Sequence, residues 1–169
     1  KRDFDMTDHL TQSFRPAGTW DSAFAACALT YDARFIRRKV IATQEGQSVL
    51  VDLPKTTSLN HGDALETADG KLIEVIAADE ALLQITGANL VQLAWHIGNR
   101  HTPCQIETDH LLIQNDPVIG HMLEHLGATV TPVTRAFTPE GGAYGHGRTH
   151  SHEHGHTAHD HDHSHDHAH

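Results

Sequence analysis

The sequence is poor in cysteine and in basic side chains. Only 2 cysteines, Cys27 and Cys104, occur among 169 residues. Two cysteines cannot supply a disulfide framework, which favours a reducing compartment, and we expect a cytoplasmic protein. Lysine and arginine together number 12 against 22 acidic residues, so the formal net charge is -10 with histidine neutral. This balance argues against a nucleic-acid-binding surface.

Long apolar runs and common catalytic motifs are also missing. No stretch approaches the roughly 18 apolar residues of a membrane helix, and no signal-peptide core opens the sequence, so we expect no membrane association. The sequence opens at Lys1 rather than Met, so we expect residues to precede it in the natural protein. The motifs of phosphate loops, zinc proteases and serine hydrolases do not occur, and we expect a protein that is not an enzyme.

The first half of the chain, which we assign to an N-terminal domain of residues 1–80, is typical of an all-β fold. Short strands over residues 20–86 alternate with turn signals. The stretch RRKVIATQEGQSVLVDLP (37–54) predicts a hairpin that turns at Glu45-Gly46. A second such unit follows at residues 58–78. Apolar side chains alternate beyond the first turn at Val49, Val51 and Leu53.

The periodicity changes in the second domain, residues 81–140. A strand at 81–88 precedes a helix at 89–99, whose apolar positions recur at helical spacing. Two strands follow, at 103–108 and 110–114. Asp116 and Pro117 then predict the start of a second helix, and Gly127 predicts its end.

The last predicted strand of this domain, residues 128–137, contains Pro132 and should therefore lie at a sheet edge. The resulting order of elements, β-α-β-β-α-β, is the ferredoxin-like pattern. The fold class predicted for the whole chain is therefore α+β, with two small domains.

Residues 141–169 form a third region, rich in glycine and then in histidine, for which we expect disorder. Histidines here are never adjacent, unlike those of most purification tags, although a tag remains one interpretation. The region holds 11 of the 18 histidines. They are His146, His150, His152, His154, His156, His159, His161, His163, His165, His167 and His169.

These imidazoles and the interspersed carboxylates suit divalent transition metals. Without fixed geometry, copper and nickel should compete well with zinc for them, following the Irving–Williams order. The alternative is a solvated polar tail whose metal affinity is incidental.

A second candidate site is the stretch HIGNRHTPCQI, residues 96–106. His101 falls on a short exposed corner between a helix and a strand, where an imidazole can face a ligand or a partner chain. His96 and Cys104 lie close enough in sequence to share an ion with it. They could equally be a helix-face histidine and a buried strand cysteine.

Other polar residues allow two interpretations. His110 is a candidate auxiliary ligand, or the first residue of a strand beside Asp109. The four-residue spacing of His121 and His125 could hold an ion, or could mark a solvated helix face. The basic cluster is either a solvated strand face or a dock for an acidic partner; it consists of Arg34, Arg37, Arg38 and Lys39.

The stretch GNRHTPCQI resembles the signature of the urease accessory metallochaperones, the UreE family. HGDAL, AADEALLQI, DPVIGHMLEHLG and PEGGAYGHG are similar to that family as well. The resemblance implies an N-terminal domain like the peptide-binding domain of heat-shock co-chaperones, and a ferredoxin-like metal-binding domain. It also implies that His101 binds Ni(II) at a homodimer interface, one histidine from each subunit, with the tail supplying further ligands.

One departure concerns the start of the second helix. Some family members carry a histidine cluster there, whereas this chain has Asn115-Asp116-Pro117. An auxiliary metal site at this position is therefore not expected, and helix capping explains Asp116.

Two functions fit this reading. The first is a nickel metallochaperone that serves urease maturation, with the other urease accessory proteins and apo-urease as its partners. The alternative is a histidine-rich store for nickel or zinc, in which the fold only displays the tail.

The sequence predicts that metal binding depends on pH. Imidazole binds a metal ion only when it is neutral, so the affinity for nickel should fall as the pH drops through about 6.5. Nickel titrations by calorimetry at about pH 7.5 and about pH 5.5, on either side of the ordinary imidazole pKa, test this expectation. Equal affinities would rule out imidazole ligation.

Overall fold

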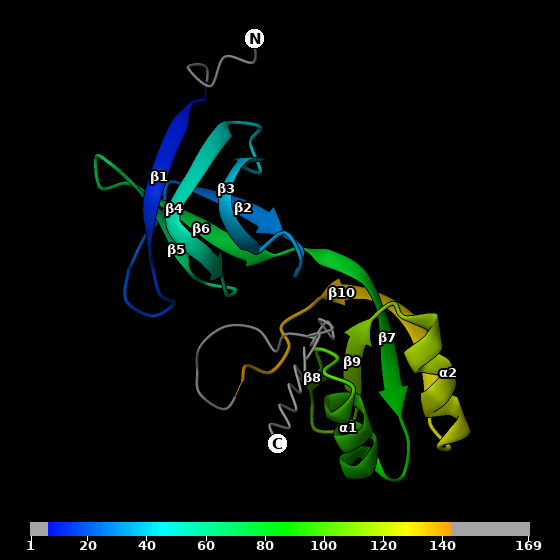
Figure 1. Cartoon of the computed structure of the whole chain (residues 1–169). Helices are drawn as coiled ribbons and strands as arrows, with labels where there is room; N and C mark the ends of the chain where they lie inside the picture. The colour runs from blue at the N-terminus through cyan, green and yellow to red at the C-terminus, as the bar shows by residue number, and fades with distance from the viewer. Residues whose placement is uncertain (1–6, 143–169) are drawn as a thin grey trace, which may run out of the picture.

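The computed structural model describes residues 7–142, which build two sheets that follow one another along the chain (Figure 1). The first sheet has six strands in the order β2-β6-β5-β1-β4-β3, and the second has four in the order β10-β7-β9-β8. The strands of the first sheet are β1 (His9–Arg15), β2 (Ala25–Leu29), β3 (Phe35–Ala42), β4 (Ser48–Ser58), β5 (Ala64–Thr67) and β6 (Leu72–Ala77). The second domain contains β7 (Asp79–Thr86), α1 (Leu90–Asn99), β8 (Gln105–Ile106), β9 (Leu111–Gln114), α2 (Pro117–His125) and β10 (Thr129–Ala136).

The expected hairpin in the first domain is present as β3 and β4, which pair antiparallel across a turn where Gly46 has a φ of 89°. Val49, Val51 and Leu53 are all buried, as the alternation predicted. They belong to one apolar cluster that also includes Leu65, Ile73 and Val75 from β5 and β6.

The first strand begins earlier than the expected start of the β region at residue 20. β1 begins at His9, where the stretch HLTQSFR offers no clear alternation, and only Thr11 in it is buried. β1 nevertheless fills the middle of the sheet, parallel to β4 and antiparallel to β5. The parallel pairs β1–β4 and β2–β6 were not predicted either, since they join segments far apart in sequence.

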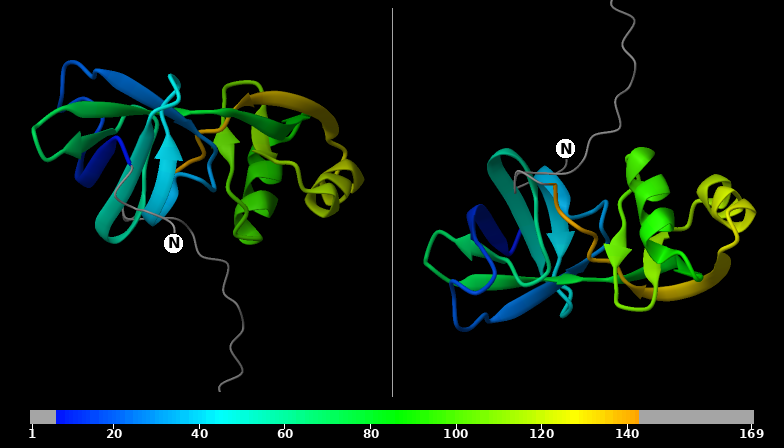
Figure 2. Two further views of the ribbon diagram at one scale, coloured as in Figure 1. Left: turned by 90° about the horizontal axis from the view of Figure 1, so that it is seen from above. Right: turned by 90° about the horizontal axis from the view of Figure 1, so that it is seen from below.

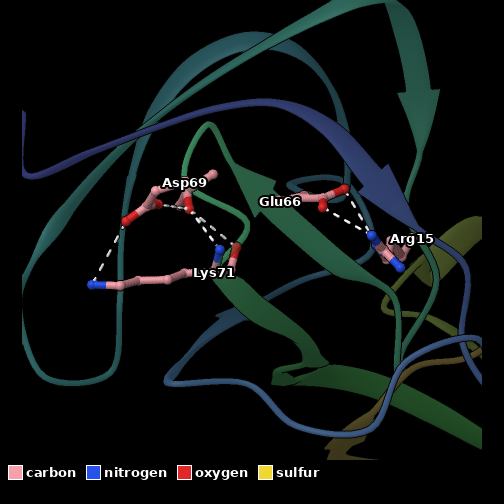
Figure 3. A network of polar contacts seen from close by, with 5 residues as sticks. Arg15, Glu66, Asp69 and Lys71 are labelled. Carbon is pink, nitrogen blue, oxygen red and sulfur yellow. Dashed lines mark hydrogen bonds and ion pairs between the residues drawn. The ribbon is translucent and has the colours of Figure 1, made fainter.

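Two groups of polar side chains form contacts at the surface of this sheet, around β5 (Figure 3). Arg15 on β1 donates two hydrogen bonds, of 3.2 and 3.0 Å, to the carboxylate of Glu66 on β5. The hydrogen bond and charge of Arg15 lower the pKa of Glu66. At the adjacent turn the Thr67 hydroxyl donates to Asp69, whose carboxylate also lies 3.8 Å from the Lys71 ammonium. Surface ion pairs of this kind contribute little stability.

In the second domain both helices pack on one face of the sheet, as Figure 2 shows. The helices contribute Leu93, Ile97, Ile119 and Leu123 to a core shared with Leu83, Ile85, Leu111 and Ile113 of the strands. The predicted cap of α2 is confirmed, because the Asp116 carboxylate accepts hydrogen bonds from the amides of Val118 and Ile119. The expected edge position of Pro132 is confirmed as well, since β10 is an outer strand.

Gly120 allows α2 to approach the sheet closely. A β-carbon at this position would lie 3.0 Å from Leu83 Cδ1 and 3.6 Å from Val130 Cγ1. Neither helix of the described chain is both long enough and apolar enough to cross a membrane.

The two domains are joined through Arg34, which is only 3% exposed. Its Nη1 donates to the carbonyl of Leu29 at 2.9 Å, and its Nη2 donates to the carbonyl of Phe137 at 2.6 Å. The Phe137 ring packs edge-on against Tyr31, against the face of the second sheet that the helices leave open. The expectation that Arg34 belongs to a solvated basic face is therefore wrong. Arg37, Arg38 and Lys39 are exposed as expected.

Arg34 should be a major contributor to stability. We expect Arg34→Ala to lower the free energy of unfolding by about 3 kcal/mol, because buried carbonyls lose charge-assisted hydrogen bonds. Arg34→Lys can replace at most part of the two hydrogen bonds of the guanidinium, so it should lower the free energy of unfolding by less than Arg34→Ala does. Urea denaturation measures both, with exposed Arg37→Ala as a control that should change stability by no more than about 0.5 kcal/mol. Equal losses for the Ala variants at 34 and 37 would contradict this role.

Candidate metal site

His101 lies immediately after α1, where the chain turns out of the helix. The amide of His101 donates to the carbonyl of Gly98 at 2.9 Å, and the amide of Thr102 donates to Ile97 at 3.3 Å. This pair of bonds is the Schellman motif, which ends helices through one residue in the left-handed conformation. His101 is that residue, with a φ of 55°.

The same motif ends α2, where the amides of Gly127 and Ala128 donate to Glu124 and Leu123. There the left-handed position holds glycine, with a φ of 91°. A left-handed backbone costs an ordinary residue about 1–2 kcal/mol. The chain therefore accepts a strained histidine at the end of α1 where glycine would satisfy the fold. Strain that folding does not require is a feature of functional positions.

The exposed imidazole of His101 borders a pocket of about 180 Å³. The pocket wall is formed by the end of α1, the turn after it, β8 and the chain beyond β10. Its residues are Ala94, Gly98, His101, Thr102, Pro103, Cys104, Ile106, Glu140 and Gly141.

The chain beyond β10 reaches this pocket by running along β8. The amide of Thr138 donates to the Gln105 side-chain oxygen at 2.9 Å, and the amide of Glu140 donates to the Cys104 carbonyl at 2.8 Å. Glu140 and Gly141 were not predicted as pocket residues, because no local pattern connects them with residues 34 or more positions earlier.

Cys104 and His96, the sequence neighbours of His101, differ from it in setting. Burial, and then the nearby charge of Glu140, raise the pKa of the Cys104 thiol to about 11. Metals bind the thiolate, so the neutral thiol is a poor ligand near pH 7. The half-buried His96 ring packs edge-on against Trp95 at 5.1 Å. Within residues 7–142, no three histidine, cysteine or acidic side chains are grouped to hold an ion.

His110 has polar neighbours at both ring nitrogens. Its Nδ1 lies 2.6 Å from Asp109 Oδ1, and its Nε2 lies 3.1 Å from Arg135 Nη1. Because guanidinium can only donate, Nε2 accepts and Nδ1 carries the proton that is donated to Asp109. The hydrogen bond from His110, and its charge when protonated, lower the pKa of Asp109. To bind a metal, His110 would have to give up one of these contacts.

The predicted ligands from His146 to His169 lie outside the described residues. The described chain ends at Gly142, directly after the residue that completes the wall of the His101 pocket. In the sequence, the first histidine of the tail, His146, follows Gly141 of the pocket wall by five residues.

Comparisons with known proteins agree along both domains. The model of the UreE urease accessory protein N-terminal domain matches residues 9–78, and that of the C-terminal domain matches residues 80–169. A urease accessory protein UreE of Ruegeria pomeroyi is 59% identical over 138 residues, 82% of this chain and 93% of the relative. Proteins of the same name from Cereibacter sphaeroides and Rhodobacter capsulatus are 56% and 51% identical, over 78% and 83% of this chain and 72% and 90% of their own lengths.

The strain at His101 can be measured. In the presence of a chelator, we expect His101→Gly to be more stable than His101→Ala, with a free energy of unfolding that is larger by about 1 kcal/mol. The reason is that glycine adopts the left-handed conformation without a steric cost. Urea denaturation of both variants gives the difference. Gly127→Ala, the matched change at the end of α2, should lower the free energy of unfolding relative to the wild type by a similar amount. Equal stabilities of the Gly and Ala variants at 101 would contradict the argument.

Proposed function

Because the chain belongs to the urease accessory protein UreE family, we propose that it is a nickel-binding metallochaperone that delivers Ni(II) to apo-urease during assembly of the urease active site. The observation that carries the proposal is the position of His101. Its backbone is strained, and its exposed imidazole borders a pocket that Glu140 and Gly141 also line, a few residues before the first histidine of the tail.

The tail histidines nearest to the pocket are the best placed to complete a site with His101. His146 follows Gly141 by only five residues and His169 by 28. A random-coil chain of five residues spans about 12 Å, and one of 28 residues spans about 30 Å. A shorter tether gives a higher effective concentration. We therefore propose His146, His150 and His152 as partners of His101, and the distal histidines as collectors of metal.

We further propose that two subunits bring their His101 side chains together. Apolar side chains are exposed along α1 and on β8: Trp95 is 63% exposed, Val91 80% and Ile106 50%. Val91 and Trp95 are four residues apart and share one helix face. Aromatic side chains are enriched in protein interfaces, so this face supports a homodimer contact.

Such a site would suit a carrier. Two imidazoles leave coordination positions open, so ligands can be exchanged one at a time with a receiving protein. Zn(II) and Cu(II) would compete for the same nitrogens. The partners would be the other urease accessory proteins and apo-urease, in the cytoplasm, a location supported by the free thiols of Cys27 and Cys104.

We also propose how each part of the chain is folded. The order β7-α1-β8-β9-α2-β10, with β9 between β7 and β8, supports a ferredoxin-like metal-binding domain over residues 81–140. We assign residues 1–80 to a domain like the peptide-binding domain of co-chaperones, and residues 141–169 to the metal-collecting tail.

The storage alternative is less favoured, because the similarity to relatives extends over both domains. A store would need only the tail, whereas delivery would use His101 and its pocket.

Nickel titration with mass measured in parallel tests the proposal on the full chain, a chain ending at Gly145, and His101→Ala in the short chain. We expect the short chain to be a dimer that binds one nickel ion tightly per dimer and loses this tight binding with His101→Ala. His96→Ala in the short chain is a matched control that should retain the ion. If the short chain binds no nickel tightly, the fold is a platform for the tail and the storage function takes precedence.

A further inference from the structure

Helix α2 carries a second pair of imidazoles outside the pocket just described. His121 and His125 lie four residues apart on the exposed side of the helix, opposite the buried Ile119 and Leu123. Their rings stand 5.7 Å apart between centroids, at 84° to each other. Together with Glu124 they line an open hollow of about 280 Å³.

Nothing in the described chain competes strongly for these side chains. Within residues 7–142, neither imidazole forms a hydrogen bond or ion pair, and their contact is with each other. His110, by contrast, has a polar partner at each ring nitrogen. A metal ion could bind the α2 pair at the cost of side-chain rotation alone.

The electrostatic setting favours a cation. His125 is the last residue of α2, and the partial negative charge of a helix C-terminus stabilises positive charge within about one turn. The exposed carboxylate of Glu124 adds a formal negative charge to the hollow.

We propose that His121 and His125 form a second, labile binding site for a divalent transition metal, with Glu124 as an additional oxygen ligand. Two residues four apart on a helix face the same side, so the rings can converge on one ion. Imidazole ligands suit Cu(II), Ni(II) and Zn(II), and the affinities should follow the order copper, nickel, zinc, apart from geometric effects. The remaining positions stay open to water or to other ligands.

This site is separate from the His101 pocket. α1 follows β7 and α2 follows β9, and these two strands are antiparallel, so the helices run in opposite directions. His101, just past the end of α1, and His125, at the end of α2, therefore lie toward opposite ends of the domain. The inference goes beyond the proposed function and does not depend on metal binding at His101.

The test uses the isotopically labelled full chain and nickel sulfate as the probe. Paramagnetic broadening of the backbone amide signals of residues 118–126 reports on α2 alone, even while the tail binds other ions. We expect broadening that saturates once nickel exceeds the capacity of the tail. His121→Gln should weaken it by about 100-fold in apparent affinity, the typical gain from a tethered second ligand.

A second variant tests whether nickel binding at α2 depends on the spacing of the two histidines or only on their number. His125→Gln combined with Leu126→His keeps the histidine count but moves one ring by about 100° around the helix, to a five-residue spacing. Both positions are exposed, so the fold should persist, which unchanged signals without metal would verify. Broadening that survives at wild-type nickel concentrations in this variant, or that is absent from the wild type, would overturn the proposal.

His101→Ala distinguishes this proposal from the proposed function. The variant should lose the effects of nickel around residues 98–106 and keep those around 118–126. Loss of both, with the fold intact, would show that the broadening of α2 depends on the His101 site and would overturn the second site.

Discussion

The arrangement of this molecule depends on one buried guanidinium. Arg34 belongs to the first domain by sequence, yet its fork spans the carbonyls of Leu29 and Phe137. Phe137 is the first residue after β10, so the contact fixes the direction in which the chain leaves the second sheet. From there residues 138–140 run along β8 and bring Gly141 to the wall of the His101 pocket. Burial removes the hydration of the Arg34 cation, and the contacts with the two carbonyls offset part of that cost, so losing either contact would destabilise the junction.

The His101 pocket shows the opposite balance. At the junction around Arg34, burial and hydrogen bonds stabilise the fold. At the end of α1, by contrast, the backbone of His101 adopts a conformation that glycine would adopt at lower cost. The strain is tolerable because the two amide bonds of the Schellman motif and the buried Leu93 and Ile97 hold the helix. The result is an exposed imidazole held at the hydrogen-bonded turn that ends α1. A helix end positions a ligand more precisely than a flexible loop does.

Much of this could be predicted from local sequence signals. The cap at Asp116, the edge strand at Pro132 and the hairpin at Gly46 follow from the geometry of single residues and were confirmed. The misses all involve distant partners. β1 pairs with strands that lie 40 or more residues away, and one of the hydrogen bonds of the buried Arg34 goes to Phe137, 103 residues later in the sequence. A local pattern reports how a side chain could be used, whereas its actual burial is decided by the rest of the fold.

The histidines illustrate this limit, because identical side chains acquire different capacities from their neighbours. The ring of His110 is occupied by a carboxylate at one nitrogen and a guanidinium at the other, so a metal would have to displace an existing contact. The ring of His96 packs against Trp95. His121 and His125 face each other across one turn of an exposed helix, and His101 borders a pocket that Glu140 and Gly141 also line. Metal affinity in this chain therefore cannot be inferred from the number of histidines. It depends on which nitrogens are unoccupied, how rigidly they are held, and how near the next ligand can approach.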